Sequence, residues 1–218
     1  MEDGFECWLP SWKYLHNACK KVVKSIKEDD FKPDVVVALS RGGFVPARNI
    51  CDMLIIKDLV SIKVDHWGIT ATKDGKARIR YPLNVDLSGK KVLVVDDITD
   101  TGESMMISLD YIKSLNPDEI RTAAALHIKT SKFVPDYYGE EIDWKWVIFP
   151  WNYVEDMCNI IPKVLDESKS KDIKKIKIDL KKNFNVDASE EDVLEILDEL
   201  EERNVVITQG SGWVKTKP

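Results

Sequence analysis

The chain has 218 residues, of which 44% are apolar and 32% are charged, and its formal net charge is −6. This composition is typical of a folded, soluble protein, and the negative charge argues against general nucleic-acid binding. No apolar run is long enough to span a bilayer, and the acidic start, Met-Glu-Asp-Gly, is unlike a secretory signal, so we expect a cytoplasmic protein. Isolated histidines and scattered cysteines indicate neither a metal site nor a disulfide framework; they are His16, His66, His127, Cys7, Cys19, Cys51 and Cys158.

The first half of the chain predicts helices alternating with buried strands. Apolar residues recur at helical spacing over 12–27, with Ser11 as the N-cap. The run 35–39 is apolar throughout and predicts a buried strand, which a helix over 44–54 follows. A short strand over 61–64 leads into a polar segment, 65–84, for which we expect a long mobile loop or a hairpin.

The middle of the chain continues this alternation. We expect a buried strand from Val92, a helix over 102–114 and a turn at Asn116-Pro117-Asp118. Two further strands are expected over 120–129 and 146–149. Strands that alternate with helices predict an α/β fold with a doubly wound, mainly parallel sheet, which we expect to occupy residues 1–162.

Residues 163–218 differ in composition and predict a second, smaller module. A lysine-rich helix is expected over 168–182, and Ser189-Glu190-Glu191-Asp192 is typical of a capping box for a helix that ends at Arg203. Apolar runs on both sides of Gln209-Gly210-Ser211-Gly212 predict a hairpin. This order resembles a winged-helix α+β module. The second helix is expected to bury Val193, Leu194, Ile196, Leu197 and Leu200.

Two roles remain open for this module. A unit of this size is only marginally stable alone, so we expect it to dock on the larger domain or on a second subunit through Ile173, Ile176 and Leu180. DNA binding through residues 169–182 is the alternative. Eleven Lys and Arg against thirteen Asp and Glu give the module a net charge of −2, which makes nucleic-acid binding the weaker alternative.

The segment from Val92 to Ser104 carries the strongest functional signal. Its apolar strand ends in two carboxylates, Asp96 and Asp97, and a loop with hydroxyls and one glycine then leads into a helix. Ligands of open α/β sheets bind beyond the carboxyl ends of the strands. The carboxylates could accept hydrogen bonds from ribose hydroxyls, while the loop and the helix N-terminus could hold a phosphate. The pattern therefore predicts a sugar-phosphate site.

This segment resembles the 5-phosphoribosyl-1-diphosphate (PRPP) motif of type I phosphoribosyltransferases, and every position of that motif matches. The resemblance implies the type I phosphoribosyltransferase fold, with Asp96 and Asp97 holding the ribose hydroxyls or the water of a Mg²⁺ cofactor. It also implies that Asp100 exchanges a proton with the incoming base. The implied 5-phosphate loop is Thr99, Asp100, Thr101, Gly102, Glu103 and Ser104, and the implied pyrophosphate loop is Ser40, Arg41, Gly42 and Gly43.

On the base side, the chain resembles the xanthine–guanine and hypoxanthine–guanine branches of this family. The resemblance implies that Lys129 binds the exocyclic oxygen of a 6-oxopurine, that Trp146 stacks on the base and that the Val147 carbonyl accepts from it. Trp144 could compete for the stacking role. Arg78 and Arg80 are candidates to reach the leaving pyrophosphate.

The implied activity is transfer of the 5-phosphoribosyl group from PRPP to guanine, hypoxanthine or xanthine in purine salvage, by a homodimer. A PRPP-sensing transcription regulator is the alternative, since some regulators join a winged helix to such a domain. A pyrimidine or adenine enzyme would explain the PRPP motif but not the pairing of Lys129 with Trp146.

Overall fold

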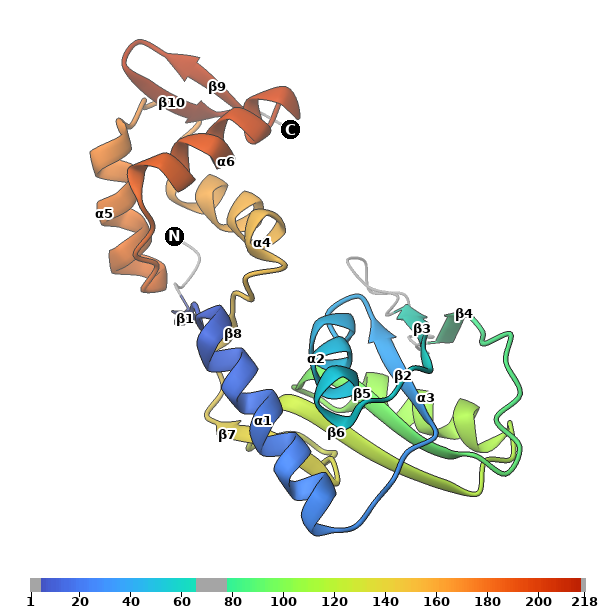
Figure 1. The fold of residues 1–218 in the computed structure, drawn as a ribbon. Coiled ribbons are helices and arrows are strands. Elements are labelled where there is room, and N and C mark those ends of the chain that lie inside the picture. The colour runs from blue at the N-terminus through green and yellow to red at the C-terminus, as the bar shows by residue number, and fades with distance from the viewer. Residues whose placement is uncertain (1–4, 66–77, 217–218) are drawn as a thin grey trace. The chain divides into compact units, whose positions relative to one another are not determined.

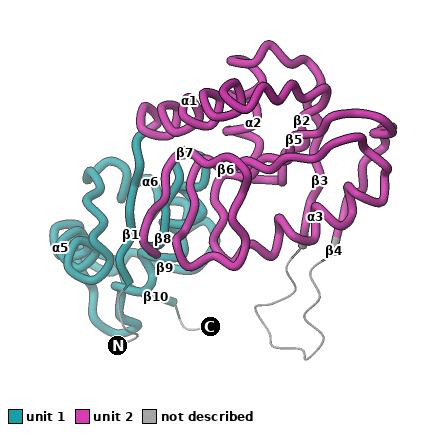
Figure 2. Tube along the Cα trace, turned by 90° about the horizontal axis from the view of Figure 1, so that it is seen from below, with its two compact units in different colours: residues 1–11, 145–218 teal, residues 12–144 magenta. Residues whose placement is uncertain are grey.

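The computed structural model describes residues 5–65 and 78–216, and this part of the chain forms two compact units (Figure 1). Unit 2 is the continuous segment Trp12–Trp144, whereas unit 1 combines Met1–Ser11 with Lys145–Pro218 (Figure 2). The chain therefore passes from one unit to the other twice. Each unit has its own apolar core and is described separately below.

Unit 2 contains a six-stranded sheet in the order β4-β3-β2-β5-β6-β7, as far as the structure is described. Only the β3–β4 pair is antiparallel among these neighbours, so the mainly parallel sheet is confirmed. The strands are β2 (Val35–Ser40), β3 (Leu59–Asp65), β4 (Arg78–Tyr81), β5 (Lys91–Thr99), β6 (Glu119–Ile128) and β7 (Tyr137–Ile142). The helices are α1 (Trp12–Glu28), α2 (Phe44–Leu54) and α3 (Glu103–Lys113).

Helices cover both faces of this sheet, because the central strands are apolar on both faces. Val36 and Leu93 pack in one cluster with α1 and α2, and Val37 and Val94 pack in another cluster with α3. Successive side chains of a strand point to opposite faces, so an unbroken apolar run supplies both clusters. Figure 2 shows α1 and α2 on one side of the sheet and α3 on the other. The doubly wound architecture is thereby confirmed.

The direction of winding reverses between β2 and β5. From β2 the chain moves outward to β3 and β4, and it then returns to the other side of β2 for β5, β6 and β7. Such a reversal leaves a crevice beyond the carboxyl ends of the two central strands, where open α/β sheets bind ligands. The loop after β2 begins at Arg41, and β5 ends at Thr99, so both predicted ligand loops leave the sheet at this point.

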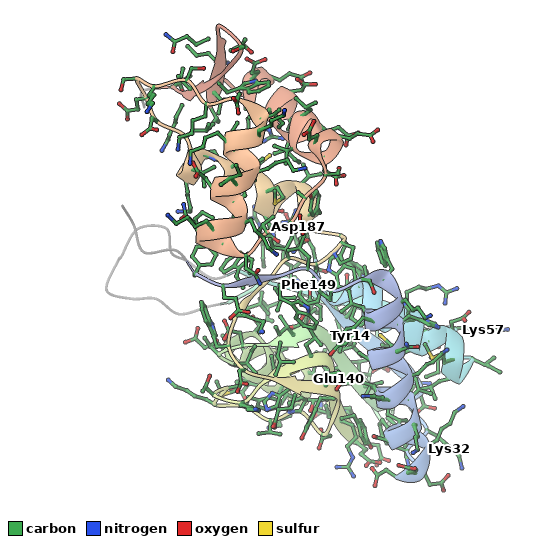
Figure 3. All side chains as sticks on the ribbon, turned by 90° about the vertical axis from the view of Figure 1, so that its left-hand side faces the viewer. Tyr14, Lys32, Lys57, Glu140, Phe149 and Asp187 are labelled. Atoms are coloured by element: carbon green, nitrogen blue, oxygen red, sulfur yellow. The ribbon has the colours of Figure 1, made fainter. Side chains whose placement is uncertain are left out.

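At the β7 edge of the sheet, α1 packs over β7 on the face that it shares with α2. Figure 3 shows Tyr14 of α1 near Glu140 of β7, and Lys21 forms an ion pair with the same carboxylate. Burial and the charge of Glu140 raise the pKa of Tyr14. In the segment 65–84, β4 pairs with β3 as one arm of a hairpin, and residues 66–77 lie outside the described residues.

Unit 1 is larger than the module expected over 163–218. Its elements are β1 (Cys7–Trp8), β8 (Trp146–Val147), α4 (Tyr153–Ile160), the 3₁₀ helix η1 (Ile161–Val164), α5 (Ile173–Phe184), α6 (Glu190–Glu202), β9 (Val206–Gln209) and β10 (Gly212–Lys215). β1 pairs in parallel with β8. Cys7, Ile148 and Met157 join the same core as Leu180 and Leu197. The compact units of the structure divide at residue 145, because this core combines residues from both ends of the chain, and the domain boundary at 163 stays a prediction.

Several details of unit 1 follow the sequence and others depart from it. The Ser189–Asp192 capping box and the β9–β10 hairpin are confirmed. Leu194, expected to be buried, is 38% exposed on α6. Ile176 and Leu180, expected to dock on another surface, are fully buried in the core of unit 1 itself, and Ile173 packs against that core. The resemblance to a winged helix stays a prediction.

Candidate functional site

The two carboxylates at the end of β5 are held at different depths. Asp97 is buried, with 8% of its surface exposed, and Asp96 is partly exposed. The Asp97 backbone N–H donates to Oδ1 of Asp96 over 2.9 Å. The Asp96 residue keeps some exposed surface, but its carboxyl group is surrounded by protein, and this burial, followed by the charge of Asp97, raises the pKa of Asp96 well above its usual range. Two adjacent carboxylates that repel one another in this way favour a cation or hydroxyl donors between them.

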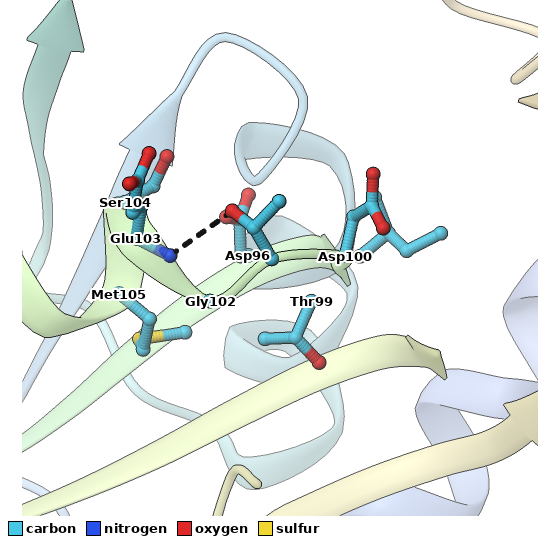
Figure 4. Close-up of a pocket in the computed structure, with 9 residues that line it drawn as sticks. Asp96, Thr99, Asp100, Gly102, Glu103, Ser104 and Met105 are labelled. Carbon is cyan, nitrogen blue, oxygen red and sulfur yellow. Dashed lines mark hydrogen bonds between the residues drawn. The ribbon is translucent and has the colours of Figure 1, made fainter. Parts of the chain in front are cut away.

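The loop after these carboxylates encloses a pocket of about 330 Å³ (Figure 4). The pocket ends on the first turn of α3, where Thr101 Oγ1 accepts a hydrogen bond from the Glu103 backbone N–H over 3.3 Å. Backbone N–H groups and the positive end of the helix dipole favour an anion there. The lining residues are Asp96, Ile98, Thr99, Asp100, Thr101, Gly102, Glu103, Ser104 and Met105, which include the predicted 5-phosphate loop.

Gly102 is required at the point where this loop becomes a helix. Its φ is +82°, a left-handed backbone conformation that residues other than glycine rarely adopt. A Cβ on this residue would lie 2.4 Å from Cβ of Phe133. The loop therefore needs both the backbone freedom of glycine and its small size. Phe133, which follows β6, was not expected to contribute here.

Thr99 lines the pocket, but its hydroxyl has a protein partner. Oγ1 lies 2.9 Å from Nδ1 of His127, and both residues are buried. Figure 4 shows the Thr99 side chain directed away from Asp100 and Ser104. Thr99 was expected to offer hydroxyl or backbone donors to the phosphate, and its hydroxyl instead anchors the loop to β6.

The predicted pyrophosphate loop lies against the carboxylates. Gly42 follows β2, and a Cβ on it would lie 1.8 Å from Oδ2 of Asp97. Only a glycine fits there without displacing the carboxylate. The Ser40–Arg41 peptide bond is cis, and Arg41 is exposed. The structure thus brings together the two motifs that are more than 50 residues apart in the sequence.

The predicted base-binding residues belong to two different units. Lys129 follows β6 in unit 2, and its Nζ forms an ion pair with Asp143 over 2.9 Å. Trp146 and Val147 form β8 of unit 1. The Trp146 indole N–H donates to Asp156 over 3.1 Å, and the residue remains 45% exposed. Trp144 is 52% exposed.

The arginine candidates lie on the edge strand β4. The Arg80 guanidinium lies 5.4 Å from the centroid of the Tyr81 ring, and the Arg78 side chain lies outside the described residues. Sequence reasoning did not identify His127 or Asp143 as neighbours of the site. The signal for His127 was its place as a lone polar residue at the end of an apolar run, and the signal for Asp143 was its place as an acidic residue directly after β7.

Two general findings apply to the part of the chain that the structure describes. No group of three or more His, Cys, Asp and Glu side chains there could hold a metal ion. No helix in residues 5–65 or 78–216 is long and apolar enough to cross a membrane.

Comparison with known proteins agrees with this geometry. The family model of the phosphoribosyl transferase domain matches residues 11–156. Xanthine phosphoribosyltransferase 1 of Saccharomyces cerevisiae is 26% identical over 183 residues, which cover 65% of this chain and 88% of that protein. Hypoxanthine-guanine phosphoribosyltransferase of Aquifex aeolicus is 28% identical over 153 residues, which cover 59% and 85%.

A solved structure shows the same fold. The purine phosphoribosyltransferase from Pyrococcus horikoshii Ot3 is 30% identical, with a TM-score of 0.60, and the match covers 67% of this chain and 94% of that one. Since the family model spans most of the chain and includes both loops of the crevice, this protein belongs to the phosphoribosyl transferase domain family.

Proposed function

We propose that this protein transfers the 5-phosphoribosyl group from PRPP to guanine, hypoxanthine or xanthine and releases pyrophosphate, as an enzyme of purine salvage. One observation carries the proposal: Gly42 of the first loop lies directly against the Asp97 carboxylate at the switch point of the sheet. A pyrophosphate site, a ribose site and a 5-phosphate site then form one continuous surface. The names of the relatives support a purine as the acceptor.

In the proposed reaction, the residues of the crevice mainly position the substrate and stabilise charge. The 100–104 loop and the N-terminus of α3 hold the 5-phosphate, and the Ser40–Gly43 loop holds the pyrophosphate. The ring nitrogen of the base forms a bond to C1 of the ribose as the bond from C1 to the pyrophosphate oxygen breaks. The pyrophosphate leaves with the electron pair, and Asp100 accepts the proton of the base.

The carboxylates of Asp96 and Asp97 suit both ribose hydroxyls and Mg²⁺. Carboxylate oxygens are the ligands that this ion prefers, and the charge of Asp97, which after burial is the next cause of the raised pKa of Asp96, is one that a cation would offset. We infer that the two residues hold the ion directly or through water. When bound, Mg²⁺ would neutralise the charge of the pyrophosphate. The carboxylates also face the positive charge that develops on the ribose.

The proposed roles of Lys129, Trp146 and Val147 in base recognition come from the family resemblance, and each is argued here within its own unit. An ammonium group donates and cannot accept, so Lys129 favours a carbonyl oxygen over an amino group. We infer that the base displaces Asp143 from this ammonium. The bond to Asp156 fixes the Trp146 indole and leaves much of the ring exposed for stacking. The Val147 carbonyl is the proposed acceptor for the base.

The transcription-regulator alternative has little in its favour. The relatives named above are enzymes, and α6 carries three acidic residues in its first turn, where DNA phosphates would be repelled. We propose a cytoplasmic homodimer that does not bind nucleic acid. Sedimentation tests the homodimer, and a gel-shift assay with duplex DNA tests nucleic-acid binding.

The decisive experiment incubates the protein with Mg²⁺, PRPP and one base at a time and measures nucleotide formation. We expect guanine, hypoxanthine or xanthine to be converted and adenine to be refused, because a site built around one hydrogen bond rejects a mismatched analogue by orders of magnitude. Lys129→Met should remove this discrimination. Efficient use of adenine, or transfer to none of the bases, would refute the proposal.

A further inference from the structure

A buried hydrogen bond ties the 5-phosphate loop to the neighbouring strand. Thr99 is the last residue of β5, and its partner in the parallel register is His127 of β6. Each is 2% exposed, and Oγ1 lies 2.9 Å from Nδ1. The Thr99 hydroxyl is thus engaged within the sheet, while the next residue, Asp100, is exposed in the pocket wall.

The surroundings of His127 hold its ring in place. The ring centroid lies 5.1 Å from that of Tyr138 on β7. Burial lowers the pKa of His127, although the Glu141 charge acts in the opposite direction, so the ring is neutral near physiological pH. A neutral imidazole has one donor and one acceptor nitrogen, and with either proton on the ring it can complete the bond to a hydroxyl.

Two apolar side chains would fill this space without any need for a hydrogen bond. A buried polar pair is stable only in the geometry that satisfies it, and either member alone is costly. The pair therefore fixes Thr99 more strictly than apolar packing would. Since Thr99 is where the loop leaves the sheet, its position determines where residues 100–104 begin.

We propose that His127 is a positioning residue for the 5-phosphate loop: through Thr99 it fixes the start of the loop and so sets the affinity for the 5-phosphate of PRPP. His127 does not touch the substrate. The inference rests on the proposed function, because it assumes that this pocket takes a 5-phosphate. The two nearby residues thus have different proposed roles: His127 acts on the 5-phosphate loop, whereas Lys129 recognises the base.

Four variants test the bond from both sides. Thr99→Val and His127→Phe remove it and keep the side-chain shape, whereas Thr99→Ser and His127→Asn keep a polar group at Oγ1 or near Nδ1. The probe is ribose 5-phosphate, which carries the 5-phosphate without the pyrophosphate, and its Kd is measured by calorimetry. KM for PRPP, KM for guanine and the melting temperature are measured for each variant.

We expect Thr99→Val and His127→Phe each to raise the Kd for ribose 5-phosphate and the KM for PRPP about threefold to tenfold, and to leave the KM for guanine unchanged. Thr99→Ser should restore near-normal binding. The double variant Thr99→Val with His127→Phe should bind no more weakly than either alone, because both remove the same bond.

Thr122→Val is the matched control. Thr122 is also 2% exposed and lies on β6, and its hydroxyl donates to Asp136 over 2.7 Å, outside the pocket. This variant should lower the melting temperature and leave the Kd for ribose 5-phosphate unchanged. Equal weakening in the control, additive losses in the double variant, or unchanged Kd in both Thr99→Val and His127→Phe would overturn the inference.

The proposed function and the inference can fail separately. If the native protein binds ribose 5-phosphate but transfers to no base, the proposed function fails, while the Kd values still test the positioning role. If transfer proceeds and the variants bind normally, the positioning role fails alone. Should His127→Phe not fold, the pair Thr99→Val and Thr99→Ser decides the question.

Discussion

Substitution of Gly102 by alanine tests how the 5-phosphate loop is built. The left-handed φ of +82° costs an alanine about 1–2 kcal/mol. The added Cβ also meets Phe133 at 2.4 Å, and forcing an extra methyl group into a packed site costs about 1–3 kcal/mol. We therefore expect Gly102→Ala to lower the free energy of unfolding by about 2–5 kcal/mol.

Gly89→Ala separates these two contributions. Gly89 has a φ of +68°, and a Cβ there meets nothing within 4 Å. This variant should lose only the backbone contribution, about 1–2 kcal/mol, and keep its KM for PRPP. Gly102→Ala should also raise the KM for PRPP, because relief of the clash moves the loop.

The assay is urea unfolding of both variants, followed by PRPP titration of each. Combining Gly102→Ala with Phe133→Gly should cost less stability than the sum of the two single substitutions, since only glycine at position 133 lacks the Cβ that clashes. Equal destabilisation of Gly89→Ala and Gly102→Ala, or normal PRPP binding by Gly102→Ala, would show that contact with Phe133 does not shape the loop.

Three further outcomes are expected. Asp96→Asn should reduce transfer roughly a hundredfold. This variant should also stabilise the ligand-free fold at about pH 7 but not at about pH 3. The pKa of Asp96 is raised in the folded protein, so its ionised form destabilises the fold once the pH exceeds the unfolded pKa of about 4. Urea unfolding measures this gain, and an equal gain from Asp110→Asn, at an exposed position, would contradict the reasoning. Ile55→Gly should stabilise the protein by about 1 kcal/mol and Ile55→Ala by less, because Ile55 is 85% exposed with a φ of +60°. A chain that ends at Pro162 should aggregate in size-exclusion chromatography, since Ile148 and Met157 lose their core partners; a soluble monomer with an unchanged melting temperature would show that unit 1 is not one core.

The sequence was most informative where function and local structure share one short segment. The strand, loop and helix around Asp96 follow from apolar runs, hydroxyls and Gly102 within thirteen residues, and all three are present in the structure. The capping box at Ser189 is equally local. These features depend on neighbours along the chain, which periodicity and capping chemistry describe directly.

What the sequence missed depends on contacts between distant residues. A strand was expected at β8, but its partner β1 was not, because all of unit 2 separates the two strands in the sequence and a two-residue run has no periodicity. The contacts of Gly42 with Asp97, Phe133 with Gly102 and His127 with Thr99 likewise join separate loops and strands. Leu194 fits the helical spacing of its neighbours but lies at the edge of the buried stripe.

The double crossing of the chain between its units constrains the order in which they can fold during synthesis. Unit 2 is one uninterrupted segment and can fold as soon as Trp144 has left the ribosome. Cys7 and its short strand are made before unit 2, whereas their partners at Trp146 and in α5 and α6 are made after it. Strand β1 must therefore stay unpaired until β8 is made. Folding of unit 2 in between shortens the flexible loop that closes when β1 pairs with β8. A variant that slows folding of unit 2 would then delay assembly of unit 1 as well, although it alters none of the contacts there.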